Sequence, residues 1–351
     1  MAVISQHLHA PVVPPRARNA EIPPALDTLI ANLLSKDPGD RPASAAEVLR
    51  TLGQPDILDM DAAPAEELSV LRRFGRGRLV GRERELGDAS SLWSHTLMGE
   101  GQMLLISGEA GIGKTRLVRE LATQAQVSGG RVLVGACYAE GGVPYAPFSQ
   151  ILRPALDNDS QASLELPEFV LADLLTLAPA LRLNYREIQP APALDDPRAE
   201  QHRLFENLVV CFTVLSDSAP LLLVLEDIHW ADSGTLFLLR HLARHTRGQR
   251  VMIVATHREA RPEEARVLYE VILDLERERL ATRLRLPRLD REQTLELLAG
   301  LFAQEIPPDF LAGIYRETEG NPFFVEEVCK ALVDSGKLYF ADGRWHGPRM
   351  E

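Results

Sequence analysis

Residues 108–115, GEAGIGKT, place glycines, a lysine and a hydroxyl side chain at a spacing that suits phosphate binding. The stretch fits the pattern GxxxxGK[ST], in which glycines let the backbone curl until its N–H groups point at phosphate oxygens. Lys114 would reach the β- and γ-phosphates of a nucleotide, and the Thr115 hydroxyl would bind Mg²⁺. A helix that starts here would add the positive end of its dipole. The predicted nucleotide-binding residues of this loop are Gly108, Gly111, Ile112, Gly113, Lys114, Thr115 and Arg116.

Two adjacent carboxylates, Glu226 and Asp227, end the apolar run in LLLVLEDIHWAD (221–232). A carboxylate at such a position can hold Mg²⁺ through water, and its neighbour can orient the attacking water in phosphoryl transfer. We favour Glu226 for the metal and Asp227 for the water. The reverse assignment stays open, so both are candidate metal ligands beside Thr115. The phosphate-binding pattern upstream disfavours the alternative, in which the acids merely end a strand at the surface.

Arg258 follows the next apolar run, VMIVAT (251–256). In an open α/β sheet a ligand lies beyond the carboxyl ends of the strands. Arg258 is therefore a candidate catalytic residue that would sense the γ-phosphate, and a surface ion pair is the alternative. In the neighbouring segment we expect Asp232 to cap the following helix. We expect His229 and Trp230 to pack beside the strand end rather than to do chemistry.

Short apolar runs alternate with helical patterns from about residue 78 onwards. The runs are 101–107, 131–136, 220–226 and 251–256, with 283–289 as a candidate fifth, and the helical patterns are 114–126, 198–216 and 233–246. This alternation predicts a parallel sheet covered by helices on both faces. We therefore expect an α/β fold of the P-loop NTPase type over residues 78–289, with a small helical insertion at about 157–197.

The pattern after this domain is wholly helical, and we predict a small helical lid over 290–351 that is truncated. Asp290 with Gln293 forms a capping pattern. A later helix begins at Pro322, because proline suits the first turn of a helix. A hairpin is expected around 341–343.

Residues 1–77 differ from the rest of the chain in their sequence pattern. Residues 23–36 place apolar side chains on one helical face, and Ser44 with Glu47 forms a capping-box pattern that opens a second short helix. Turn residues and acids then dominate. We therefore assign residues 1–52 to a short all-helical segment and 53–77 to a linker.

Composition excludes several classes of protein. The 351 residues carry a net charge of −12 with 45% hydrophobic residues, which is ordinary for a soluble globular protein and unfavourable for nucleic-acid binding. The three cysteines lack CxxC spacing and are expected to be buried thiols. Neither a membrane helix nor a signal peptide is apparent, so we expect a cytoplasmic protein that does not contact membranes.

Six arginines lie within residues 72–84, RRFGRGRLVGRER. A nucleic-acid patch is conceivable, but no aromatic residues are interleaved in the manner of such a patch and the overall charge opposes it. We favour a solvated linker followed by Gly81 and Arg82 facing the nucleotide, and we expect no direct contact of this segment with nucleic acid.

Residues 78 to about 340 together resemble the P-loop ATPases of the STAND class, within the AAA-like group often labelled origin-recognition-like. The motifs that carry the resemblance are LVGRERE (79–85), GEAGIGKTRLVREL (108–121), CYAEGGVPYAPF (137–148), LLLVLEDIHWAD (221–232), ATHRE (255–259) and GNPFFVEEV (320–328). The resemblance implies an ATP-gated signalling switch that uses Mg²⁺. It also implies that Val80, Gly81 and Arg82 lie near the nucleotide, that Arg258 is the sensor, and that Pro322 of the lid touches the adenine side. The family usually has Asp where Glu226 stands, which bears on the metal role and on the rate of hydrolysis.

Residues 1–52 resemble the last helices of a Ser/Thr protein kinase domain through IPPALDTLIANLLSKDPGDRPASAAEVL (22–49). In that family Arg41 would pair with a buried glutamate of the activation segment. That glutamate and the kinase catalytic motifs are not in this sequence, so kinase activity is not expected from it. The resemblance implies a fragment of a kinase–ATPase fusion regulator.

Two hypotheses for function remain. The first is a slow ATPase whose cycle moves the lid and alters contacts with other domains of the parent protein, with partner proteins, or within a nucleotide-dependent oligomer. The second is an interaction module that holds ATP or ADP and does not hydrolyse it. Both bind nucleotide, and turnover distinguishes them.

Overall fold

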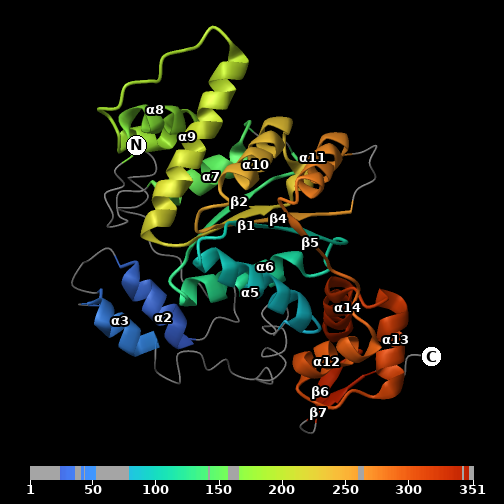
Figure 1. Cartoon of the computed structure of the whole chain (residues 1–351). Helices are drawn as coiled ribbons and strands as arrows, with labels where there is room; N and C mark the ends of the chain where they lie inside the picture. The colour runs from blue at the N-terminus through green and yellow to red at the C-terminus, as the bar shows by residue number, and fades with distance from the viewer. Residues whose placement is uncertain are drawn as a thin grey trace. The chain divides into compact units, whose positions relative to one another are not determined.

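The computed structural model describes most of the chain (Figure 1). The described residues are 24–35, 41–42, 44–52, 79–140, 143–156, 166–259, 265–341 and 344–347. The linker predicted at 53–77 lies outside them. The chain divides into two compact units. The larger unit extends over Gly77–Ala331, and the smaller one combines Leu332–Gly347 with residues before Gly77.

A five-stranded parallel sheet forms the centre of the larger unit. Its strands are β1 (Gln102–Ser107), β2 (Arg131–Ala136), β3 (Leu221–Glu226), β4 (Val251–His257) and β5 (Thr282–Arg285). Their order is β2-β3-β4-β1-β5, so β1 lies between β4 and β5. The predicted α/β fold with a parallel sheet is thus confirmed.

The fifth strand is shorter than the run predicted at 283–289. The Leu286 N–H still donates to the Ser107 carbonyl at 2.9 Å. The next residue is Pro287, which has no N–H to offer a neighbouring strand. The ladder therefore ends there.

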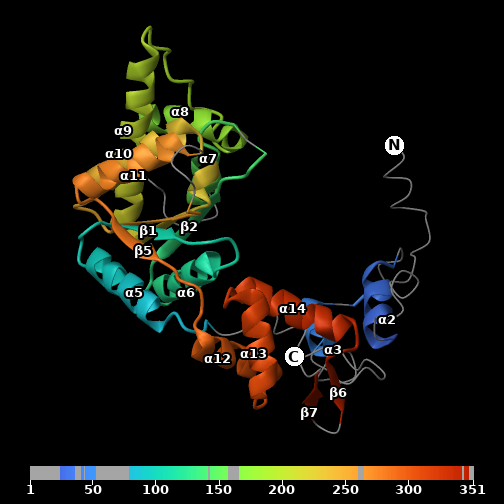
Figure 2. The same ribbon diagram turned by 90° about the vertical axis from the view of Figure 1, so that its right-hand side faces the viewer.

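Helices cover both faces of the sheet, as two views at right angles make clear (Figures 1 and 2). One face packs against α5 (Glu83–Leu97) and α6 (Lys114–Val127). The other face packs against α7 (Ala146–Ala155), α9 (Pro197–Ser218), α10 (Ser233–His245) and α11 (Arg266–Arg277). Successive strand residues point to opposite faces, so Leu104 packs with α6 whereas Leu105 belongs to the core under α9 and α10.

The expected helical insertion at about 157–197 contains α8 (Glu168–Leu177) and the 3₁₀ helix η4 (Pro179–Leu183), and residues 157–165 lie outside the described part. A buried carboxylate ties α8 to α9. Asp173, 4% exposed, accepts hydrogen bonds from Arg203 at 2.8 and 3.0 Å and from Asn207 at 2.7 Å. A buried charge needs such partners to offset its lost hydration.

Three helices follow the sheet: α12 (Arg291–Phe302), α13 (Pro308–Thr318) and α14 (Pro322–Asp334). Asp290 and Gln293 form the predicted capping box at the start of α12. The ends of the α12–α13 segment meet, because the Leu289 N–H donates to the Gly320 carbonyl at 2.9 Å. Gly320 has a φ of +76°, and a Cβ there would lie 1.9 Å from the Leu289 carbonyl oxygen. Only glycine fits this approach.

The smaller unit contains the N-terminal helices and the C-terminal hairpin. Its elements are α2 (Pro24–Leu33), α3 (Ala45–Leu52) and the antiparallel strands β6 (Tyr339–Ala341) and β7 (Arg344–His346). The Glu47 N–H bonds to the Ser44 hydroxyl at 3.3 Å, as one half of a capping box requires. The predicted hairpin is confirmed, although 342–343 lie outside the described residues. Within the described ranges, no helix is long and apolar enough to cross a membrane.

Among the described residues, replacing Arg203 with leucine would leave the buried Asp173 carboxylate with Asn207 as its remaining side-chain donor. We expect Arg203→Leu to lower the free energy of unfolding by about 3 kcal/mol, the cost of removing one partner from a buried charge. Arg198, an exposed arginine five residues earlier on α9, supplies the control, and Arg198→Leu should change stability by less than about 0.5 kcal/mol. Urea unfolding of both variants measures this, and equal losses would contradict the role given to Asp173.

Candidate nucleotide-binding site

The loop between β1 and α6 has the conformation that its glycines predict. Gly111 has a φ of +75°, and Gly113, at the N-cap of α6, has a φ of +103°. A side chain at Gly111 would also meet a neighbour, because its Cβ would lie 2.5 Å from the Phe323 Cβ. The glycines therefore serve both the curl of the loop and its close contact with α14.

Side-chain and backbone donors satisfy the carbonyl groups of the loop. Lys114 Nζ donates to Gly108 (2.9 Å) and Glu109 (2.8 Å), Asn321 Nδ2 donates to Ala110 (3.0 Å), the Phe323 N–H donates to Gly111 (3.3 Å), and the Arg82 guanidinium donates to Ile112 (3.4 Å). The carbonyl and the N–H of one trans peptide point in opposite directions. The N–H groups of Gly111 and Gly113 therefore point away from the donors that hold the Ala110 and Ile112 carbonyls, and this orientation is suited to receive phosphate oxygens. The Ile112 N–H donates to the Glu109 carbonyl at 3.4 Å.

Lys114 is buried, and its ammonium is folded back onto the first two loop carbonyls. Burial lowers the pKa of Lys114, whereas the charge of Asp227 raises it and that of Arg258 lowers it. An ammonium has three donors and can exchange carbonyl oxygens for phosphate oxygens. Thr115 and Arg116 follow in the first turn of α6, where both are half-buried.

The predicted acidic pair ends β3 at the same edge of the sheet. Asp227 adopts a left-handed conformation with a φ of +56°, which is uncommon for a residue other than glycine. Its N–H donates to the Thr256 hydroxyl on β4 at 2.9 Å. The Glu226 carbonyl accepts the Cys137 N–H at 3.0 Å. Asp227 thus follows β3 at the edge of the sheet that carries the loop, and its charge opposes the lowering of the Lys114 pKa by burial.

His229 lies beside the acid that follows β3, and its contacts with Asp227 and Arg258 were not predicted from the sequence. Its side chain is 7% exposed, and its Nδ1 lies 3.7 Å from Asp227 Oδ1 and accepts the Arg258 N–H at 3.4 Å. Its ring packs on Trp230 with 4.9 Å between centroids. His229 thus packs at the strand end as predicted, whereas Trp230 is 46% exposed. The sequence signal for these contacts is the position of His229, two residues after Asp227.

Arg258 lies beyond the end of β4 with an exposed side chain. The next residue, Glu259, forms an ion pair with Arg285 at 2.6 Å. Burial is the main cause of the lowered pKa values of Lys114 and His229, and the positive charge of Arg258 lowers both further. The strand therefore delivers Arg258 to the edge that carries the loop and the acids.

The segment 80–82 forms another wall of the site. Arg82 is 2% exposed, donates to the Ile112 and Pro287 carbonyls and lies 3.7 Å from Glu85. Burial is the main cause of the lowered pKa of Arg82. Val80 is half-buried beside it, and Gly81 accepts a hydrogen bond from Gln293 Nε2 at 3.4 Å. All three predicted residues lie along one strip of chain beside the loop.

The helices α12–α14 occupy the segment predicted as a lid, and this segment contacts the loop through the start of α14. Pro322, expected at the adenine side, lies between the two residues that bond the Ala110 and Gly111 carbonyls. Arg116 and Glu326 form an ion pair of 3.7 Å between α6 and α14. Arg288 bridges Glu109 of the loop, at 2.9 Å, and Glu319 at the end of α13. The loop is thus tied to the lid by backbone, amide and ionic contacts.

The three cysteines are buried and free, as predicted. Burial raises the pKa of the Cys137 thiol, near the end of β2, to about 12, and the charges of Asp232 and Asp227 add to the effect. The thiol is thus protonated at neutral pH.

Asp232 caps α10 as predicted, accepting the Thr235 N–H at 2.9 Å.

A model of a known protein family matches residues 78–254, just over half of the chain, and its description is AAA ATPase domain. An uncharacterized protein of Rhizobium meliloti (strain 1021) is 28% identical over 284 residues, which are 73% of this chain and 25% of that protein. The chain therefore spans about a quarter of the length of this curated relative.

Two solved structures are similar over much of the chain. The ORC1 protein of Aeropyrum pernix, solved in complex with DNA, is 18% identical with a TM-score of 0.47 over 78% of this chain and 64% of that one. A STAND protein with a tetratricopeptide repeat sensor from Pyrococcus horikoshii is 18% identical with a TM-score of 0.36 over 70% of this chain and 28% of that one.

Two histidines at the strand ends predict how stability depends on pH. Burial is the main cause that lowers the pKa values of His229 and His257. The folded state therefore binds fewer protons than the unfolded state once the pH falls below about 6.5, the ordinary pKa of histidine. The free energy of unfolding should fall as pH decreases from about 7 to 5, by at most about 1.4 kcal/mol per pH unit for each histidine.

Urea unfolding over this pH range, in the parent and in His257→Gln, measures the effect. The variant should show a shallower pH dependence, because it lacks one of the groups that titrate differently in the two states. His95→Gln, at an exposed position of α5, is the control and should keep the parent slope. A His257→Gln slope equal to that of the parent would contradict the assignment.

Proposed function

This chain belongs to the AAA ATPase domain family, and from that premise we propose that it is a switch that binds ATP with Mg²⁺ and hydrolyses it slowly. One observation carries the proposal. The lid donors Asn321 and Phe323 hold the same loop whose lysine, Lys114, lies ready to exchange backbone carbonyls for phosphate oxygens. The nucleotide and the lid would then both contact the backbone of residues 108–112.

The oxygen donors at the site suit Mg²⁺. The Thr115 hydroxyl and the Glu226 and Asp227 carboxylates are hard ligands of the kind that this ion prefers. Mg²⁺ would neutralise charge on the phosphate oxygens. Glu226 and Asp227 divide the metal-holding and water-orienting roles. The action of the Asp227 charge on Lys114 supports Asp227 on the phosphate side.

The remaining site residues would bind the nucleotide and orient it. Gly108, Gly111, Ile112 and Gly113 supply the loop backbone, and Arg116 carries the ion pair that links α6 to the lid. Val80, Gly81 and Arg82 form the wall beside the loop, and Pro322 lies on the lid side, where it would face the adenine. Arg258 is proposed to approach the γ-phosphate, because its exposed side chain has freedom to move at the strand edge.

The switch works through contacts that the nucleotide and the lid both make with the loop. Phosphate binding requires Lys114 to leave the Gly108 and Glu109 carbonyls, and the loop then has a different balance of contacts with α14. Binding linkage is reciprocal. If ATP binding changes the affinity of the lid for a partner, then binding of that partner changes the affinity for ATP by the same factor. Other domains of the parent protein, partner proteins or a nucleotide-dependent oligomer would use this coupling.

A module that holds nucleotide without hydrolysing it is the second candidate. The observation that favours it is Glu226, which stands where the family that the chain resembles has aspartate. A longer side chain would place the carboxylate differently relative to the metal. Both candidates require the same binding site.

The resemblance of residues 1–52 to a kinase tail remains a proposal. It is supported by two short helices, α2 and α3, and by Arg41, whose Nε donates to the Ser35 carbonyl at 2.8 Å. The signalling role, and the membership of the chain in a kinase–ATPase fusion, rest on that resemblance together with the switch geometry.

Single-turnover hydrolysis of ATP with Mg²⁺ tests the roles of Lys114 and Asp227. Lys114→Ala should lose binding, because it removes the cation that faces the phosphates. Asp227→Ala should keep ATP binding and lose at least about a hundredfold in rate, a loss of the size expected for a group that acts on proton transfer or on the attacking water. Absence of turnover in the parent, with tight binding lost only in Lys114→Ala, would replace the ATPase by the nucleotide-holding module.

The switch itself is tested at Asn321, which both bonds the Ala110 carbonyl and accepts the Phe323 N–H as a helix cap. Asn321→Ser keeps a capping hydroxyl and removes the donor to the loop. We expect ATP to bind about fivefold more weakly, because the Ala110–Gly111 peptide loses a hydrogen bond worth about 1 kcal/mol that directs the Gly111 N–H toward the phosphates. Asn184→Ser, at an exposed position of the insertion, is the control. Unchanged or tighter binding of ATP to Asn321→Ser would contradict the coupling between the lid and the loop.

A further inference from the structure

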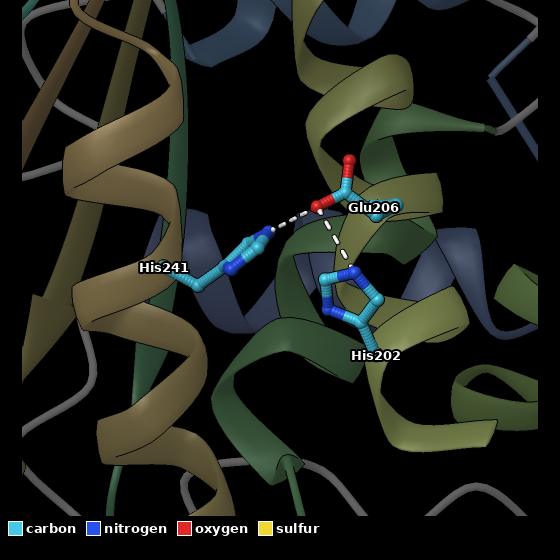
Figure 3. Close-up of side chains that lie close together, drawn as sticks. All are labelled: His202, Glu206 and His241. Carbon is cyan, nitrogen blue, oxygen red and sulfur yellow. Dashed lines mark ion pairs between the residues drawn. The ribbon is translucent and has the colours of Figure 1, made fainter. Parts of the chain in front are cut away.

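Three side chains with metal-binding atoms lie together on helices that do not contribute to the nucleotide site. His202 and Glu206 are one turn apart on α9, and His241 lies on the adjacent helix α10. Figure 3 shows the three side chains pointing toward one another across the gap between the helices. One ligand atom from each lies within 4.8 Å of the others.

A single carboxylate oxygen faces both imidazoles. Glu206 Oε1 lies 3.0 Å from Nε2 of His241 and 3.9 Å from Nε2 of His202. The two rings are nearly perpendicular, with 5.9 Å between their centroids. His241 Nε2 is buried, and among the described residues no atom satisfies it with hydrogen-bond geometry. The cluster thus contains an unsatisfied nitrogen aimed at a carboxylate.

The nearest arginines of α10 are engaged elsewhere. Arg240 pairs with Asp274 and Arg244 pairs with Glu278, both on the side of α11. Within the described part of the chain, the ion-pair contacts of Glu206 are those with the two histidines. A permanent positive charge is therefore lacking beside Glu206, and a bound cation would supply it.

We propose that His202, Glu206 and His241 bind one divalent transition-metal ion, with Zn²⁺ as the representative ion. Two imidazoles and one carboxylate are a ligand set that Zn²⁺ uses, with water in the fourth position. Imidazole also distinguishes this class of ion from Mg²⁺ and Ca²⁺, which prefer oxygen ligands. The site is separate from the proposed Mg²⁺ site and goes beyond the proposed function.

The separations fit such an ion after small rotations. Zn–N and Zn–O bonds of about 2.0–2.2 Å in a tetrahedron place ligand atoms about 3.3 Å apart. The observed 3.0 and 3.9 Å bracket that value. His241, whose side chain is 13% exposed, is held by its stack on His245 at 4.2 Å and by Phe205 at 5.5 Å. His202 is exposed and free to close on the ion.

The ion would join the helix before β3 to the helix after it. Strand β3 lies between α9 and α10 in sequence and ends at Glu226. A metal cross-link between α9 and α10 would restrain the chain on both sides of β3, the strand that ends at Glu226.

Zinc titration of the full chain, free of metal and nucleotide, against a chromogenic zinc indicator tests the proposal. We expect one tight site per chain, weakened at least about tenfold by each of His202→Gln, Glu206→Gln and His241→Gln. His95→Gln is the matched control, because His95 Nδ1 also faces a carboxylate, Glu100 Oε2, at 3.9 Å without a third ligand. It should bind zinc as the parent does.

His202→Gln keeps the test decisive if the buried His241 cannot be replaced without unfolding, because His202 is exposed. Cobalt(II) gives a second measurement: the parent should show the visible absorption of a four-coordinate complex, and His202→Gln should lose it. Zinc binding of equal strength in the parent and in His202→Gln and Glu206→Gln would overturn the proposal. No saturable binding to the parent at micromolar zinc would overturn it as well.

Discussion

The carbonyl groups of the loop at residues 108–112 are the constraint on which the site depends. A buried or half-buried carbonyl needs a donor, and here the donors come from Arg82, Lys114, Asn321 and the Phe323 N–H. These donors belong to the segment before the sheet, to the first turn of α6 and to the lid. The loop is therefore the point at which three parts of the larger unit meet, and the direction of its N–H groups follows from how its carbonyls are satisfied.

The strand order explains why the chemical groups meet there. Parallel strands present their carboxyl ends at one edge, and β1 is flanked by β4 and β5. The loop after β1 is thus adjacent to Arg258 after β4, and β3 brings Asp227 one strand further away. The hydrogen bond from the Asp227 N–H to Thr256 joins the ends of β3 and β4. His229 adds a second link between them by accepting the Arg258 N–H.

Local features were predictable from the sequence, whereas contacts between distant segments were not. The loop, the strands and the capping box at Asp290 depend on residues a few positions apart, and the sequence patterns predict them well. The early end of β5 follows from Pro287, whose effect on the ladder is visible only once the neighbouring strand is known. The bond from Asn321 to Ala110 spans 211 positions. The cluster of His202, Glu206 and His241 requires α9 and α10 to lie side by side, which hydrophobic periodicity alone does not determine.

The closure of the α12–α13 segment upon itself has a mechanical consequence. Because Leu289 and Gly320 are bonded and in close contact, the two helices form a block with little internal freedom. Helix α14 leaves that block at Asn321, directly beside the loop, and its 13 residues extend about 20 Å. The helix is then a lever with its fulcrum at the loop 108–112. A tilt of about 10° at Asn321 would displace its far end by about 3.5 Å, as simple trigonometry on that length gives. In the proposed switch, the exchange of a carbonyl for a phosphate oxygen would act at the short end of this lever, and the far end of the helix would move most.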